Sequence, residues 1–149
     1  MEHLKQTDIQ TYADEVHALY AFLDDADAYT LDDVETLIDD GDYLVLDDGD
    51  ADEKAEEYIR YSVWAFNANF IACHCPDGID EEHITALRGD SCEDVNEALI
   101  ALIDAGNGME HFMLDAISSD GRGHFISCYD GEEHEVTYKD TEYYIYRTN

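Results

Sequence analysis

The chain has 149 residues, of which 38 are Asp or Glu and only 7 are Lys or Arg, so its formal net charge is −31. A surface this acidic repels phosphate backbones and anionic headgroups, which excludes direct binding of nucleic acid or membrane through most of that surface. Apolar residues make up 45% of the chain and aromatic residues 11%, which predicts a folded protein rather than one disordered by its charge. A single domain over 1–149 is the expectation for this length.

The N-terminal part of the chain predicts two amphipathic helices. Apolar residues recur at steps of three and four over about 8–26, which predicts a helix. Thr7 and Gln10 form a capping box at its start. Thr30 begins a second, shorter helix whose apolar side chains share one face. Gly41 is expected to end this helix.

The middle of the chain predicts further helices after a short apolar run at 43–46, which is either a strand or a buried connector. A third helix begins near Asp50, and its apolar pattern continues to Ile71 before Pro76 breaks it. Two helices over about 81–88 and 92–105 and a last one before residue 120 complete this part. Asp80 and Ser91 are the expected N-caps of the first two.

The C-terminal part has a different pattern, with branched and aromatic runs at 124–129, 135–138 and 143–146. The turn dipeptide Asp130-Gly131 separates the first run from the second. The predicted fold class is therefore α+β: a mainly helical part over 1–120 packs on a C-terminal three-stranded antiparallel β-meander in 121–149.

The acidic residues are concentrated in two groups. Sixteen fall between Asp24 and Glu57, opposed only by Lys54, and a second group lies between Asp80 and Glu97. The apolar residues between them must face the core, so the carboxylates have to share the outward surface. We expect a partner-binding acidic face made of Asp24, Asp25, Asp32, Asp33, Glu35, Asp39, Asp40, Asp42, Asp47, Asp48, Asp50, Asp52, Glu53, Glu56, Glu57, Glu81, Glu82, Glu93, Asp94 and Glu97.

The amount of charge indicates what such a face would imitate. Solubility alone needs a net charge of magnitude roughly 2–8, far below the value of this chain. Duplex DNA carries one negative charge per about 1.7 Å of axis, so a mimic of ten base pairs needs about 20 charges. The two acidic groups hold a comparable number. The expected partner is therefore a basic protein that normally binds DNA.

The small size, the extreme acidity and the carboxylates on short helices resemble the phage- and plasmid-encoded DNA mimics that inhibit restriction enzymes or CRISPR effector complexes. The C-terminal stretches 121–125, 129–133 and 143–147 are also similar to small phage proteins without an assigned activity. The resemblance implies a non-catalytic inhibitor that occupies the DNA channel of a host defence protein, in the host cytoplasm.

Two other interpretations of the acidity stay open. Adaptation to a saline cytoplasm would give an ordinary domain many Asp residues and only 3 Lys, although it should spread the charge evenly. An acidic adaptor or chaperone for a basic protein outside host defence would show the same pattern. The basic partner, identified by a pull-down, distinguishes all three.

The string Cys73-His74-Cys75 is the part of the sequence most like a metal site, because thiolates and imidazoles bind zinc. Paired zinc ligands usually have the spacing C-x2–4-C, and no second pair follows, so the alternative is ordinary buried or exposed thiols. We therefore expect no bound metal. If a metal does bind, Cys73, His74 and Cys75 are the candidate ligands. The sequence has no motif of nucleophilic or nucleotide-dependent catalysis, so no catalytic residue, enzyme activity or cofactor is expected.

The Tyr-rich end allows two interpretations. Tyr143, Tyr144 and Tyr146 fit a half-buried sheet, and together with Arg147 they also fit an interface with the target or with a second copy in a homodimer. No segment approaches the about 20 apolar residues of a membrane span, and the N-terminus lacks a signal-peptide pattern. The expected location is the cytoplasm.

Overall fold

The computed structural model describes residues 11–24 and 28–149. The chain divides into two compact units, of which the first comprises Met1–Ala51 and Ser127–Asn149 and the second Asp52–Ile126. In the sequence, the second unit is thus inserted into the first. The expectation of one domain over 1–149 stays a prediction.

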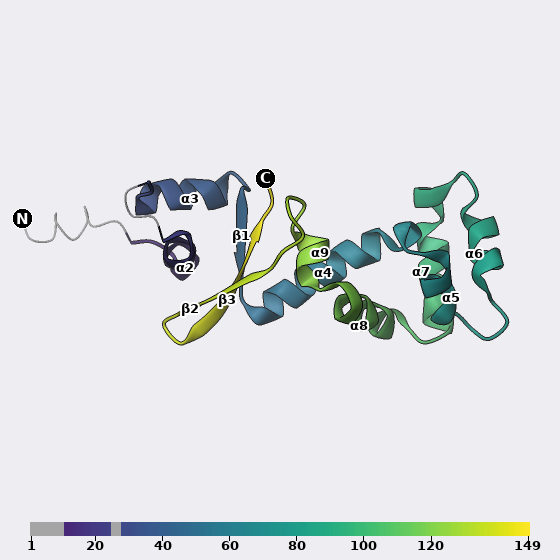
Figure 1. Cartoon of the computed structure of the whole chain (residues 1–149). Helices are drawn as coiled ribbons and strands as arrows, with labels where there is room; N and C mark the ends of the chain where they lie inside the picture. Colours follow the sequence, from purple (N-terminus) through teal and green to yellow (C-terminus); the bar gives the residue numbers. More distant parts are fainter. Residues whose placement is uncertain (1–10, 25–27) are drawn as a thin grey trace, which may run out of the picture. The chain divides into compact units, whose positions relative to one another are not determined.

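The first unit is built on a three-stranded antiparallel sheet with two helices packed against it (Figure 1). The strands, in the order β1-β3-β2, are β1 (Tyr43–Leu46), β3 (Thr141–Arg147) and β2 (His134–Tyr138). The helices are α2 (Asp14–Leu23) and α3 (Leu31–Asp39). Their apolar faces and one face of the sheet form a core that contains Val16, Leu19, Val34, Val45, Tyr143 and Ile145.

Helix α3 begins where the sequence predicts it. The Thr30 hydroxyl accepts a hydrogen bond from the Asp33 backbone N–H, and the Asp33 carboxylate accepts one from the Thr30 N–H. This reciprocal capping satisfies two backbone donors that a helix start leaves unpaired. Helix α2 is shorter than the predicted 8–26, because it begins at Asp14 and ends before Asp24. The predicted capping box at 7–10 lies outside the described residues.

The α+β class and a three-stranded antiparallel sheet are confirmed, but one predicted strand is wrong. Residues Arg122–Ile126 form the short helix α9, in which Gly123 and Ile126 are buried at the three-residue spacing of a helix. The third strand is instead β1, and its Val45 lies opposite Ile145. The sheet is therefore not a meander of the last residues, since β1 and β3 are about 100 residues apart in the chain.

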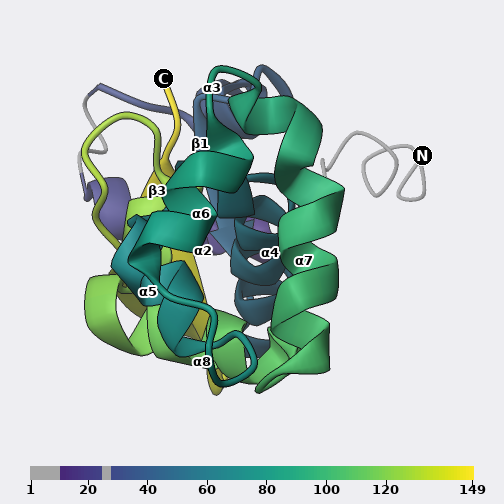
Figure 2. The same cartoon turned by 90° about the vertical axis from the view of Figure 1, so that its right-hand side faces the viewer.

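The second unit is helical and has its own core. Its elements are α4 (Asp48–Tyr61), which begins in the first unit, then η1 (Val63–Ala65), α5 (Ala68–Cys73), α6 (Glu81–Arg88), η2 (Cys92–Val95), α7 (Asn96–Ala105), α8 (Met109–Asp120) and α9. Helices α5 and α6 lie side by side (Figures 1 and 2). The largest side chains of the core are Ile59, Ile71, Ile84, Leu99, Ile103 and Phe112, all fully buried. None of the helices in the described part of the chain is both long and apolar enough to cross a bilayer.

The predicted helix from Asp50 to Ile71 is interrupted. Helix α4 ends at Tyr61, and α5 begins only after Asn67, whose side chain accepts a hydrogen bond from the Asn69 N–H. Between them, the buried Asn96 side chain accepts a hydrogen bond from the Trp64 N–H at 3.1 Å. A long-range contact of this kind ends the helix although the local apolar pattern continues.

Candidate functional site

Helix α3 carries one part of the predicted acidic face. Val34 is fully buried on the side that packs in the core, whereas Asp32, Asp33 and Asp39 are exposed. No Lys, Arg or His lies within this helix. The carboxylates of α3 therefore have no counter-charge on their own element.

Helix α4 shows the same division at a higher charge density. Ala55 and Ile59 are fully buried one turn apart, while Asp52, Glu53 and Glu57 are exposed on the remaining surface. The alternation follows from the helical period, because residues four apart share a face. The acidic side of α4 is thus fixed by the apolar side that the core requires.

Burial and the crowding of carboxylates both affect the ionisation of Glu56. Partial burial raises the pKa of this carboxyl above its ordinary value, and the negative charges of Asp52, Glu110 and Glu53 raise it further. The positive charge of Arg60 lowers it, but less than burial and the acidic neighbours raise it. Like charges at short range disfavour ionisation in this way. Repulsion between these side chains is therefore built into the folded state.

The second acidic group lies wholly in the second unit. Its predicted face members are in the first turn of α6, in η2 and at the start of α7. The first group is divided between the two units at residue 52. A single face made of both groups therefore stays a prediction. By sequence, the first unit has 22 acidic and 3 basic residues and the second has 16 and 4, so both are strongly negative.

The predicted members of the acidic face are accessible wherever the structure describes them. Asp25 lies outside the described residues. Glu35, Asp42 and Glu56 are half-buried. The exposed members are Asp24, Asp32, Asp33, Asp39, Asp40, Asp47, Asp48, Asp50, Asp52, Glu53, Glu57, Glu81, Glu82, Glu93, Asp94 and Glu97.

Several of these carboxylates also stabilise local structure. The Asp47 carboxylate accepts a hydrogen bond from the Asp50 N–H at 2.8 Å, at the start of α4. The Asp32 carboxylate accepts one from the Tyr12 hydroxyl at 2.5 Å, and this bond is the main reason why the pKa of Tyr12 rises to about 12. The Arg122 guanidinium pairs with Asp52 at 3.0 Å. Such residues have a structural role whatever their part in binding.

The Tyr-rich strand β3 contributes mainly to packing. Tyr143, Tyr144 and Tyr146 are all at least nine-tenths buried in the central strand of the sheet. The Tyr146 hydroxyl donates a hydrogen bond to Glu133, and burial raises the pKa of Tyr143 and Tyr144. This placement agrees with the sheet interpretation and leaves these side chains little surface for a partner. Arg147 is half-buried with its guanidinium over the ring of Tyr129.

The string Cys73-His74-Cys75 does not form a cluster of metal ligands. Cys73 is exposed, whereas Cys75 is buried and its thiol donates a hydrogen bond to the Ile71 carbonyl. Burial raises the pKa of the Cys75 thiol, which disfavours the thiolate that a metal requires. Among the described residues, the string contributes only His74 to a group with metal-ligand spacing.

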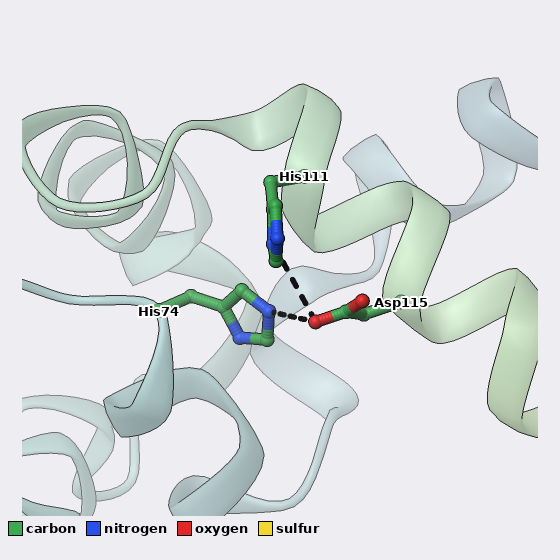
Figure 3. A group of neighbouring side chains, drawn as sticks. All are labelled: His74, His111 and Asp115. Atoms are coloured by element: carbon green, nitrogen blue, oxygen red, sulfur yellow. Dashed lines mark hydrogen bonds and ion pairs between the residues drawn. The ribbon is translucent and has the colours of Figure 1, made fainter.

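That group consists of His74, His111 and Asp115, and it lies in the second unit (Figure 3). His74 is the C-cap residue of α5, while His111 and Asp115 are one turn apart on α8. The His74 Nε2 lies 2.8 Å and the His111 Nδ1 3.5 Å from the same oxygen, Asp115 Oδ2. No local pattern of the sequence predicts this group. The His-x3-Asp spacing in a predicted helix was visible, but its partner 37 residues earlier was not.

The hydrogen bonds of His74 restrict what its ring can do. The Nδ1 atom lies 3.0 Å from the Phe70 carbonyl oxygen, which can only accept, so Nδ1 must carry a proton. In a neutral imidazole, the lone pair of Nε2 then faces the Asp115 carboxylate. Two acceptors this close repel each other unless a cation, either a proton or a metal ion, lies between them.

No protein-family model, curated protein or solved structure matches the chain.

Proposed function

We infer that the chain is a non-catalytic DNA-mimic inhibitor whose acidic surface occupies the DNA-binding channel of a host defence protein, either a CRISPR effector complex or a restriction enzyme. The observation that carries this proposal is the excess of exposed carboxylates over nearby basic residues on α3 and α4. The basic protein is recognised through charge density, so the chain needs neither a cofactor nor a catalytic group.

The charge density of α4 supports the comparison with DNA. From Asp48 to Glu57 this helix rises about 14 Å and carries six acidic residues with Lys54 as the one basic residue in the interval. Duplex DNA of the same length carries about 8 negative charges. A short helix therefore offers a basic channel a similar number of charges per unit length. Most of these carboxylates are exposed.

The electrostatic repulsion within this surface also supports a role in binding. Burial raises the pKa of Glu56 most, and the negative charges of Asp52, Glu110 and Glu53 add to this rise, so neighbouring carboxylates oppose ionisation in the folded chain. A basic partner would relieve that repulsion, because each Lys or Arg of the channel would replace a missing counter-charge. Binding should then be fast and strongly salt-dependent, as it is for DNA itself.

Adaptation to high salt is the second candidate. The observation that favours it is the negative charge of both units, rather than of one binding surface alone. In that case the acidic residues bind no specific partner, and they keep the protein soluble in a saline cytoplasm. An acidic adaptor for another basic protein differs from the inhibitor only in its partner.

The test is competition for DNA. A panel of restriction enzymes and CRISPR effector complexes is incubated with labelled target DNA and increasing amounts of the chain at low salt, and bound DNA is followed by fluorescence anisotropy. We expect at least one member to release its DNA, with an inhibition that weakens steeply as salt is added. Full DNA binding by every member at low salt would contradict the proposal.

Two charge-reversal variants test whether the predicted face is responsible. The variant D39K/D40K/E53K/E57K changes four exposed residues of the predicted face. The control D77K/D120K/E132K/E135K changes the net charge by the same amount at exposed positions outside the face. We expect only the first to lose inhibition while both keep the circular dichroism spectrum of the parent. Equal losses in both variants would show that net charge, and not the face, is responsible.

A further inference from the structure

We propose that His74, His111 and Asp115 bind one divalent transition-metal ion of the zinc class, through Nε2, Nδ1 and Oδ2 respectively. The three ligand atoms lie within 4.8 Å of one another and come from two elements of the second unit. Two imidazoles and a carboxylate are a ligand set that suits zinc and its neighbours. This site is independent of the acidic surface and of the function proposed for it.

The separations of the two imidazole nitrogens from Asp115 Oδ2 fit a metal of this size with little movement. Two ligands held about 2.0–2.1 Å from a tetrahedral ion lie about 3.3 Å apart. The separation of 3.5 Å between His111 Nδ1 and Asp115 Oδ2 already matches this value. The separation of 2.8 Å between His74 Nε2 and the same oxygen would have to widen by about 0.5 Å. Asp115 is partly exposed, with 46% of its side chain accessible, so it can adjust.

His74 is held in the orientation that a ligand needs. Its Nδ1 donates to the Phe70 carbonyl, the type of contact that fixes the tautomer of metal-bound histidines and leaves Nε2 free to coordinate. Its ring packs against Phe70 and Phe112, with centroids 4.9 and 5.1 Å away. The Asn107 N–H donates to the His74 carbonyl at 2.9 Å and fixes the backbone as well. The buried ligand is therefore positioned before any ion binds.

The other two ligands leave a path for the ion. His111 is 59% exposed and lies one turn before Asp115 on α8, so both can be reached from solvent. Three protein ligands leave the fourth position of a tetrahedral ion to water. The ion would also remove the repulsion between the Nε2 lone pair and the carboxylate, because both would then donate to it.

A second group of potential ligands, Asp130, Glu132 and His134, provides the matched control. The Asp130 carboxylate already accepts hydrogen bonds from the Glu132 N–H and the Ser127 hydroxyl, and these bonds hold its pKa below the usual range. Asp130 and Glu132 are both exposed. No buried imidazole is oriented into this group, so it should bind transition metals no better than the other surface carboxylates do.

The experiment is a cobalt titration in excess magnesium. Magnesium occupies the many surface carboxylates, which suit it, whereas a histidine-containing site prefers the transition metal. Co²⁺ absorbs visible light with an intensity that reports low coordination number. We expect one Co²⁺ per chain with such a spectrum, displaced by one Zn²⁺. Absence of this spectrum, or binding abolished by magnesium, would overturn the proposal.

Variants identify the ligands. We expect H111A and D115N to weaken Co²⁺ binding by at least about tenfold, because even the loss of a residue that only supports a ligand has about this effect. His111 is exposed, so its substitution should leave the fold intact, which circular dichroism checks. H134A and C73S should bind as the parent does. Unchanged affinity in H111A, or a loss in C73S, would assign the ion to other residues and overturn the proposal.

Discussion

Gly106 lies so close to the backbone at His74 that a Cβ atom on it would overlap the His74 carbonyl oxygen and come within 2.6 Å of the Cys75 carbonyl carbon. Both neighbours are backbone atoms that cannot rotate away. We therefore expect Gly106→Ala to push α7 and the end of α5 apart and to lower the free energy of unfolding by about 1–3 kcal/mol. Urea denaturation followed by circular dichroism measures the change.

The same substitution at another glycine is the control. Gly49 is in the first turn of α4, and the nearest atom to an added Cβ is a side-chain oxygen of Asp47 at 3.7 Å. Gly49→Ala should therefore raise the free energy of unfolding by about 0.5–1 kcal/mol, because alanine loses less backbone entropy in a helix. Equal effects of the two substitutions would contradict the close approach at Gly106.

Asn96 provides a second prediction about stability. Its buried carboxamide accepts a hydrogen bond from the Trp64 N–H and donates one to the Arg60 carbonyl at 2.9 Å. Asn96→Ala leaves both backbone groups without this partner, so we expect a loss of about 2 kcal/mol or more. Asn69→Ala removes an exposed amide and should change the stability by less than about 0.5 kcal/mol. A small loss in both variants would show that the Asn96 contacts contribute little.

The raised pKa of Glu56 predicts how stability depends on pH. Because the folded chain holds the proton of Glu56 more tightly than the unfolded chain does, this group favours folding below its ordinary pKa of 4.5 and loses that contribution as pH rises through the raised value. Glu56→Gln mimics the protonated form. Its advantage over the parent should be absent at low pH and grow to at most about 1 kcal/mol at neutral pH. Melting temperatures across this pH range test it.

The Arg60 guanidinium has the opposite influence, because it lowers the pKa of Glu56. Arg60→Gln should therefore destabilise the chain at neutral pH and have a smaller effect in acid. If Glu56→Gln and Arg60→Gln shift the melting temperature in the same direction at neutral pH, the charge of Glu56 does not explain their effects on stability.

Salt should stabilise the chain. Raising the salt from 0.15 to 1 M shortens the screening length from about 8 to about 3 Å, which weakens repulsion among the carboxylates within α3 and among those within α4. We expect a chain that is already folded at 0.15 M KCl and melts at a higher temperature at 1 M. The variant D39K/D40K/E53K/E57K should show a smaller shift. A chain that is unfolded at 0.15 M would instead favour adaptation to high salt.

The sequence predicts the parts of this fold that depend on neighbours in the chain. Helix α6 has the predicted bounds, and the Asp80 carboxylate caps it by accepting from the His83 N–H. Helix α3 likewise begins after Thr30 with a capping box, although the partner at its third position is Asp33. Caps and helical periods act within four residues, so a local pattern is enough to find them.

The predictions fail for features that depend on contacts between residues far apart in the chain. The predicted strand at 124–129 is short, with Phe125 and Ile126 next to each other, and such short runs fit a strand or a buried helix equally well. The strand β1 depends on its pairing with β3, which no local pattern encodes. The group of His74, His111 and Asp115 cannot be predicted from the sequence for the same reason: His74 and Asp115 are 41 residues apart, and only the packing of α5 and α8 into one core brings them together.

The pairing of β1 with β3 also determines the order in which the chain can fold during synthesis. β1 leaves the ribosome about 95 residues before β3 does. During this interval, the backbone N–H and C=O groups of β1 lack their hydrogen-bond partners in β3. The second unit is continuous in the sequence and is fully synthesised in this interval. It can therefore fold first, whereas the first unit stays open until the final strand arrives. Loss of that strand would remove the middle of the sheet and leave β1 and β2 with no common neighbour.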